Sequence, residues 1–275
     1  MTPQPSRSAP PDPAPPVKRE TIDGIAVLTL DSPATRNALS EAMIEALQEA
    51  LDAIRADDAV RAVVIAARGP AFSSGHDLKE LTARRADPDK GRAFFARLMT
   101  SCSAMMQTIV HLPKPVIAAV QGVATAAGCQ LVATCDLAVA SEQAMFATPG
   151  VNIGLFCSTP MVALSRNVPR KHAMHMLLTG EAITAQRAQE IGLVNSVVAA
   201  GSERDAALTL ARTVAAKSAY TLKVGKEAFY RQAEMSLADA YLYTAQVMTE
   251  NMMARDAQEG IGAFIGKRAP KWEDR

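Results

Sequence analysis

The chain has 275 residues, a length that suits one α/β core with a helical extension better than two large domains. Its 29 Lys and Arg balance 28 Asp and Glu, so it has no overall positive field to bind nucleic acid, and an anionic ligand has to be held locally. Hydrophobic residues form 49% of the chain and aromatic residues only 4%, which predicts a core of many small contacts.

The N-terminal segment MTPQPSRSAPPDPAPPV is rich in proline. It has neither the apolar run of a secretion signal nor the Arg-rich amphipathic pattern of an organelle transit peptide, so we expect residues 1–17 to be a disordered tail and the protein to be cytoplasmic. No apolar run reaches the ~18 residues that a membrane span needs, so no membrane partner is expected. His172 and His175 have no acidic third ligand beside them, and no metal site is expected.

The first half of the chain alternates apolar strands with helices. Residues 24–31 (GIAVLTLD) predict a strand, and the next helix is indicated by Ile44, Leu47, Leu51 and Ile54 at helical spacing. This alternation predicts an α/β fold. Three further apolar runs predict buried strands: residues 62–67, 114–122 and 136–141.

The second half is mostly helical. Thr159 and Pro160 predict the start of one helix, Gly180 the end of the next, and Thr184 and Gly192 the two ends of a third. We expect three parts: a tail at residues 1–17, an α/β core at 18–200 and a helical region at 201–275. The four cysteines have no C-x-x-C spacing, which favours reduced, buried thiols over disulfides.

Two loops combine small residues with a following helix, SSGHD at residues 73–77 and ATAAGCQ at 124–130. Such loops leave unpaired backbone N–H groups at the positive end of a helix dipole. Two of these N–H groups converging from separate loops would form an oxyanion hole, which stabilises negative charge on a carbonyl oxygen. Tight turns without a chemical role would have the same spacing, so the spacing leaves both interpretations open.

Three segments in order resemble the crotonase (enoyl-CoA hydratase/isomerase) superfamily over nearly all of residues 18–275. AFSSGHDLKEL resembles its F-x-x-G-x-D-[LI] loop, VQGVATAAGCQLVATCD its G-x-x-x-G-G-G-x-E-L-x-x-x-C-D segment, and EGIGAFIGKRAPKW its C-terminal motif. The resemblance implies a spiral of ββα units with a C-terminal helical trimerisation region, assembled as a homotrimer or a dimer of trimers. It also implies a coenzyme A thioester as substrate, with no prosthetic group and no metal.

The resemblance also implies the binding residues. The thioester oxygen would accept hydrogen bonds from the backbone N–H groups of His76 and Ala127, while the His76 imidazole is expected to be a spectator. The residues that match the family's CoA contacts are Arg36, Ser74, Asp77 and Leu78, together with Phe264 and Lys267, which often come from a neighbouring subunit.

The chain departs from the hydratase pattern at both catalytic glutamates, which are replaced by Gln130 and Gly150. An amide can hold a water molecule but cannot take its proton. Three functions stay open: a hydratase or isomerase that moves protons through Ser158, Cys157 or a water held by Gln130; an acyl-CoA-binding regulatory protein without turnover; and a thioesterase-like hydrolase. Cys157 is also well suited to a packing role in the pocket wall.

Overall fold

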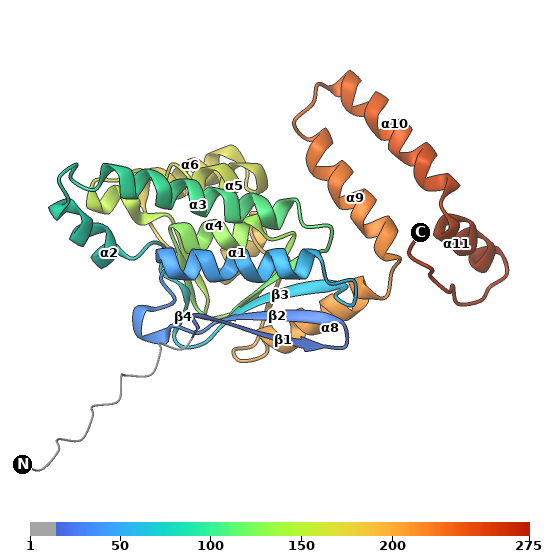
Figure 1. The fold of residues 1–275 in the computed structure, drawn as a ribbon, viewed down its shortest axis with the longest axis horizontal. Helices are drawn as coiled ribbons and strands as arrows, with labels where there is room; N and C mark the ends of the chain where they lie inside the picture. The colour runs from blue at the N-terminus through green and yellow to red at the C-terminus, as the bar shows by residue number, and fades with distance from the viewer. Residues whose placement is uncertain (1–14) are drawn as a thin grey trace, which may run out of the picture.

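Two sheets form the centre of the protein in the computed structural model, which describes residues 15–275 (Figure 1). In this part of the chain the larger sheet has the order β1-β2-β3-β5-β7-β10 and the smaller β4-β6-β8-β9. Pairing is parallel except for β1 with β2 and β8 with β9. The strands are β1 (Val17–Ile22), β2 (Ile25–Leu30), β3 (Ala62–Ala67), β4 (Ala71–Ser73), β5 (Val116–Val120), β6 (Val123–Thr125), β7 (Leu137–Ser141), β8 (Met145–Ala147), β9 (Ile183–Thr184) and β10 (Ser196–Val198).

Helices cover both faces of the larger sheet and continue beyond it. In residues 15–275 they are α1 (Glu41–Arg55), α2 (Leu78–Ala83), α3 (Arg92–Val110), α4 (Ala127–Thr134), α5 (Pro160–Asn167), α6 (Arg170–Thr179), α7 (Ala185–Glu190), α8 (Glu203–Ala215), α9 (Ala219–Gln232), α10 (Leu237–Met253) and α11 (Arg255–Ile265), with short 3-10 turns η1 (Pro33–Thr35), η2 (Arg84–Ala86) and η3 (Pro149–Ile153). None of these helices combines the length and the apolar character that crossing a membrane needs.

The chain repeats one unit: a strand in the larger sheet, a short strand in the smaller sheet, and then a helix. The predicted strands at residues 62–67, 114–122 and 136–141 are confirmed as β3, β5 and β7, whose apolar runs are buried between the two helical layers. The short strands β4, β6 and β8 were not predicted, because three residues are too few for a hydrophobic period. Each unit therefore brings a turn between the two sheets to the carboxyl end of a buried strand.

Most predicted helix ends are confirmed. Thr184 accepts a hydrogen bond from the backbone N–H of Arg187, and Gly180 takes the left-handed conformation after α6. Pro160 is the first residue of α5, but the Thr159 side chain makes no capping bond. The backbone of Thr159 is already helical, because a turn begins at Cys157. The Cys157 carbonyl accepts the N–H of Met161, the second residue of α5.

The helical extension that leaves the sheet is α9 to α11 (Figure 1). By contrast, α8 packs its Ala207, Leu208 and Ala211 against the face of the sheet that carries Ile25 and Val27. The predicted boundary near residue 200 therefore falls before a helix that packs with the core. The division into domains stays a prediction. Of the predicted tail, residues 1–14 lie outside the described residues, and β1 already begins at its last residue.

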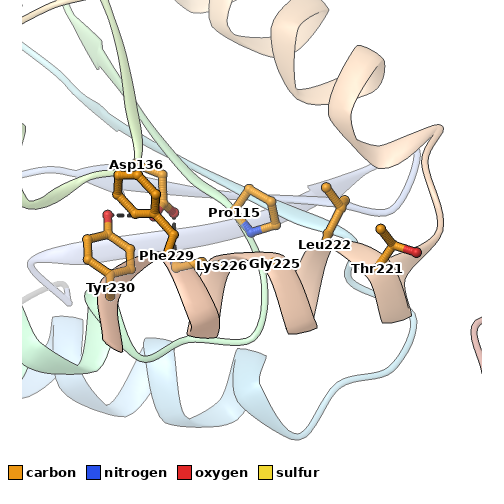
Figure 2. Close-up of a pocket in the computed structure, with 8 residues that line it drawn as sticks. All are labelled: Pro115, Asp136, Thr221, Leu222, Gly225, Lys226, Phe229 and Tyr230. Atoms are coloured by element: carbon orange, nitrogen blue, oxygen red, sulfur yellow. Dashed lines mark hydrogen bonds and ion pairs between the residues drawn. The ribbon is translucent and has the colours of Figure 1, made fainter. Parts of the chain in front are cut away.

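A polar cluster joins α9 to the amino ends of β5 and β7 (Figure 2). Lys226 Nζ lies 2.6 Å from Asp136 Oδ2 and donates to the carbonyls of Ile109 and Lys114 at 2.9 and 3.0 Å. Asp136 also accepts from Tyr230 OH at 2.8 Å and from the N–H of Val116 at 2.7 Å. Burial lowers the pKa of Lys226, while the Asp136 charge opposes that shift. A cavity of about 330 Å³ adjoins this cluster.

We predict that Asp136→Asn lowers the free energy of unfolding by about 3–5 kcal/mol, because it leaves the Lys226 charge buried and unpaired. The side chains of Lys226 and Asp136 are only 8% and 16% exposed, so water can replace little of the lost interaction. Urea denaturation measures the change. The matched control is Glu234→Gln, which breaks the exposed pair with Arg166 and should cost less than about 1 kcal/mol. Equal costs for the two substitutions would contradict this role of Asp136.

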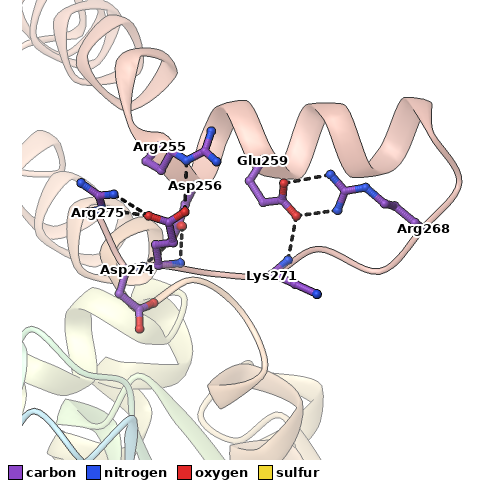
Figure 3. Close-up of polar contacts among 8 residues, drawn as sticks. Arg255, Asp256, Glu259, Arg268, Lys271, Asp274 and Arg275 are labelled. Atoms are coloured by element: carbon purple, nitrogen blue, oxygen red, sulfur yellow. Dashed lines mark hydrogen bonds and ion pairs between the residues drawn. The ribbon is translucent and has the colours of Figure 1, made fainter.

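The last residues of the chain fold back along α11 and are held by two carboxylates (Figure 3). Asp256 accepts the backbone N–H groups of Glu273 and Asp274 at 2.7 and 2.9 Å. Glu259 accepts both terminal nitrogens of Arg268 at 2.6 and 2.9 Å and the N–H of Lys271 at 2.8 Å. The bonds from Arg268 and Lys271 lower the pKa of Glu259 to about 2. For Asp256, burial favours the neutral carboxyl, but the bonds from Ser218 and the two backbone N–H groups outweigh it and lower its pKa.

Acid should release this C-terminal segment. A carboxylate whose pKa is lower in the folded state stabilises the fold above its ordinary pKa and loses that contribution as the pH falls towards the folded value. The window for Glu259 runs from its ordinary value of 4.5 down to about 2. Trp272, the only tryptophan in the chain, donates its indole N–H to the carbonyl of Ala216 and reports the release. We predict a red shift of its fluorescence in this window.

The control for this experiment is Asp256→Asn, which removes one of the two charged acceptors and keeps its size. This variant should show the red-shifted emission at a higher pH than the wild type. An Asp256→Asn variant with the emission and the acid midpoint of the wild type would contradict the proposal that Asp256 fixes the C-terminal segment.

Candidate functional site

The two loops singled out in the sequence meet at the N-terminus of α4. A Cβ atom placed on Gly75 would lie 3.2 Å from the backbone N of Ala127 and 2.9 Å from the Cβ of Ala126. At the next residue of α4, a Cβ on Gly128 would overlap the backbone oxygen of Ser73. Only glycine allows this approach of α4 to the strand before the first loop. The backbone N–H of His76, which directly follows Gly75, is thereby brought next to the start of α4.

The backbone N–H groups of His76 and Ala127 are both uncommitted. In the part of the chain that the structure describes, neither of them donates to a protein acceptor. Ala127 is the first residue of α4, so its N–H points out of the positive end of the helix dipole. Ala126, which precedes it, has φ 50 and ψ −119, a conformation costly for a residue with a Cβ. The start of α4 therefore has two backbone donors without a protein acceptor beside a strained residue.

The His76 imidazole contacts the backbone of Leu39. Its Nδ1 lies 3.1 Å from the carbonyl oxygen of Leu39, and the two residues also form an isolated parallel bridge. The Nε2 atom is buried and has no hydrogen-bond partner among the described residues. Burial lowers the pKa of the imidazole, and the bond to Leu39 offsets only part of this shift. The ring is therefore neutral at pH 7.

Gln130 lies one turn into α4, where its N–H donates to the carbonyl of Ala126. The residue is 5% exposed, and its Oε1 has no partner among residues 15–275. Thr148, only 1% exposed, has the same property at Oγ1. Thr148 lies near the start of α4, because the carbonyl of the preceding residue, Ala147, accepts the N–H of Ala126 at 2.9 Å. Buried polar atoms without a partner are costly, so they mark a place for a polar ligand.

The position of the second hydratase glutamate is filled by the following loop. A Cβ on Gly150 would lie 2.7 Å from the carbonyl oxygen of Leu155 and 2.9 Å from the Sγ of Cys157. Burial raises the pKa of the Cys157 thiol, and the Gly150 N–H opposes that shift only in part. At neutral pH the thiol is protonated, and it fills space as a small apolar group. Ser158 is exposed and donates to the carbonyl of Phe156.

The structure brings most of the residues matched to CoA contacts together around the first loop. The N–H of Ser74 donates to the carbonyl of Arg36 at 3.1 Å. Asp77 caps α2 by accepting the N–H groups of its first turn, and Leu78 is half exposed.

Phe264, which is 85% exposed, and Lys267 lie on the α11 side of the molecule and are not part of this cluster within one chain (Figure 1). Among residues 15–275, no three side chains of His, Cys, Asp or Glu gather as a metal ion would require.

The comparisons with known proteins identify the family to which the chain belongs. The chain belongs to the enoyl-CoA hydratase/isomerase family, whose sequence pattern matches residues 20–275. It is 48% identical over 257 residues to human enoyl-CoA hydratase domain-containing protein 3, mitochondrial, which covers 94% of this chain and 83% of that protein. It is 34% identical to 2,3-dehydroadipyl-CoA hydratase of Escherichia coli over 91% of this chain and 96% of that one.

Solved structures agree with this assignment. A crystal structure of an enoyl-CoA hydratase from Mycobacterium smegmatis matches with a TM-score of 0.89 and 49% identity, covering 94% of this chain and 99% of that one. The structure of the human domain-containing protein 3 matches with a TM-score of 0.88 and 48% identity, over 94% of this chain and all of that one. The predicted fold class, a crotonase-like α/β fold with C-terminal helices, is confirmed, as is the predicted membership of this family.

The prediction of a cytoplasmic location is wrong. It relied on the composition of the N-terminal tail, whereas the relatives from human, rat and mouse are named as mitochondrial proteins. Residues 1–14 lie outside the described part of the chain, so they support no conclusion about a leader sequence. Sequence reasoning also missed Thr148, although it lies only two residues before Gly150. A buried hydroxyl there gives no periodic signal.

We predict that Gly150→Ala lowers the free energy of unfolding by about 1–3 kcal/mol, because the added methyl group would press on the backbone of Leu155. Urea denaturation measures the effect. The matched control is Gly225→Ala on the exposed side of α9, where a Cβ meets no atom within 4 Å. That variant should be as stable as the wild type or more stable by up to about 1 kcal/mol. A Gly150→Ala protein as stable as the wild type would contradict this prediction and show that the loop around Leu155 can move without cost in stability.

Proposed function

We propose that the protein binds an acyl-CoA thioester at the N-terminus of α4 and polarises its carbonyl through the backbone N–H groups of His76 and Ala127. The single observation that carries this proposal is the contact between Gly75 and the start of α4, where both N–H groups lack an acceptor. Each such donor is worth about 2.7–4 kcal/mol of barrier in enzymes that stabilise an oxyanion. The donors have no pKa of their own near neutrality, so they act over a wide pH range.

The CoA moiety would lie along the first loop. The contact of Ser74 with Arg36 joins the two segments that match the family's nucleotide contacts, and Arg36 can pair with a phosphate. Phe264 and Lys267 would close over the CoA of a neighbouring subunit, which fits their distance from α4 within one chain (Figure 1). No prosthetic group is needed for this binding.

A homotrimer, alone or paired into a hexamer, would supply that neighbour. The helices α10 and α11 expose large apolar side chains, among them Leu237 and Leu242 at 76% each and Ile265 at 76%. Apolar surface of this extent on protruding helices marks an interaction surface. We propose that this surface of α10 and α11 packs against another copy of the chain.

The reaction proposed for this site is enoyl-CoA hydration or isomerisation, as a lyase or isomerase in fatty acid metabolism. Gln130 cannot act as a general base, and Gly150 offers no side chain, so the two-glutamate route is absent. A second candidate function is an acyl-CoA-binding regulatory protein without turnover. The observation that favours it is the closure of the Gly150 position by Leu155 and Cys157.

The test combines calorimetric binding of butyryl-CoA with ultraviolet detection of crotonyl-CoA turnover. We predict that butyryl-CoA binds and that crotonyl-CoA is hydrated slowly. Gln130→Glu should raise the hydration rate at least about tenfold, because it restores one carboxylate near the acyl group. Gln107→Glu is the control, since Gln107 is exposed on α3 and the substitution adds the same charge there, which should leave the hydration rate unchanged.

Binding without any turnover, in the wild type and in Gln130→Glu, would support the regulatory function instead. Absence of butyryl-CoA binding would contradict both functions.

A further inference from the structure

The proposed function needs only the backbone N–H of His76 and assigns no role to its imidazole. Nδ1 faces the carbonyl of Leu39 at 3.1 Å. A carbonyl can only accept, so Nδ1 carries the proton and donates it. In the neutral ring Nε2 is then a free lone pair, and this atom is buried without a partner among the described residues. A base held by a bond at its other nitrogen is the arrangement found where imidazoles take protons.

The charged groups around His76 accept hydrogen bonds from backbone N–H groups and do not pair with the imidazole. Asp77 accepts the N–H groups of Lys79 and Glu80. Glu80 in turn accepts the N–H of Glu41 on α1. On the α4 side, Gln130 and Cys129 bring no charge, and burial keeps the Cys129 thiol protonated by raising its pKa to about 12. No carboxylate therefore pairs with the ring, and burial sets the direction in which the pKa of His76 moves, which is downward.

Three buried atoms without partners belong to segments that converge at the start of α4: His76 Nε2, Gln130 Oε1 and Thr148 Oγ1. The convergence follows from the contact of Gly75 with Ala127 and from the backbone bond between Ala126 and Ala147. Nε2 and Oε1 both need a donor, and the Thr148 hydroxyl can donate or accept. A water molecule, with two protons and two lone pairs, matches such a set.

We infer that the His76 imidazole is the proton-handling group of the acyl site and takes the place of the missing glutamates, with Gln130 and Thr148 orienting the water. This inference rests on the proposed binding of an acyl-CoA thioester. It makes His76 a bifunctional residue, whose N–H stabilises the thioester oxygen while its ring moves the proton.

The proton balance for an enoyl thioester is complete without another reactant. The water oxygen forms a bond to Cβ while Nε2 takes one of its protons. The electron pair of the double bond moves towards the thioester oxygen, which the N–H groups of His76 and Ala127 hold. The imidazolium then returns its proton to Cα, and the carbonyl re-forms. With a saturated thioester the same ring can take and return an α-proton, which exchanges it with solvent.

The experiment measures exchange of the α-protons of butyryl-CoA in deuterium oxide by NMR, beside its calorimetric affinity. His76→Asn is the first variant, because its amide can still donate to Leu39 but has no ring nitrogen to take a proton. His76→Ala is the second variant, and it keeps the backbone N–H. We expect the affinity to stay within about threefold in both variants and the exchange rate to fall about 10²–10⁴-fold, the usual range for loss of a general base.

The wild type also gives a pH profile that needs no variant. The base acts in its neutral form, so exchange should rise with pH through a pKa below the ordinary 6.5 of histidine and then stay level. Exchange that falls as the pH rises, or unchanged exchange in both variants, would overturn the inference.

Two further outcomes separate this inference from the proposed function. Wild-type protein that binds butyryl-CoA but neither exchanges its α-protons nor hydrates crotonyl-CoA overturns the role of His76 and leaves acyl-CoA binding in place. Wild-type protein that does not bind butyryl-CoA contradicts the proposed function itself.

Discussion

The close approach of two backbones at the start of α4 is the constraint on which the rest of the site depends. Gly75 and Gly128 permit this approach because a side chain at either position would meet backbone atoms of the other segment. The approach brings the loop of Gly75 and His76 to the start of α4, where Ala126 has a costly conformation. Main-chain donors fixed in this way need no reorganisation when charge develops on an oxygen, which is the physical basis of an oxyanion hole.

The fold supports this contact from both ends of the larger sheet. The two loops and Thr148 follow the carboxyl ends of the short strands β4, β6 and β8 in the smaller sheet. At the amino ends of β5 and β7, Asp136 and Lys226 fix α9 to the sheet. The cavity beside that pair is lined by Pro115, Asp136 and residues of α9, so it belongs to the junction with the helical extension. Beyond the junction, α10 and α11 expose large apolar side chains.

Much of this arrangement could be predicted from the sequence, because the strands are continuous apolar runs and the loops carry recognisable motifs. The resemblance to the family also implied that Gln130 and Gly150 stand at the positions of the two hydratase glutamates. It could not predict that Cys157 and Leu155 would close the space beside Gly150, since that closure depends on the path of a loop. The role of Leu39 was equally hidden, because it lies 37 positions from His76 and acts through its carbonyl. The location was predicted wrongly, because tail composition is weak evidence.

The most direct test of the central claim is the infrared carbonyl stretch of butyryl-CoA labelled with ¹³C at its thioester carbon and bound to the protein. Two hydrogen bonds from His76 and Ala127 would weaken the C=O bond, so the stretch should move to lower frequency on binding and stay there in Gln130→Leu, which leaves both amides intact. A bound thioester whose stretch matches that of free butyryl-CoA would contradict the account.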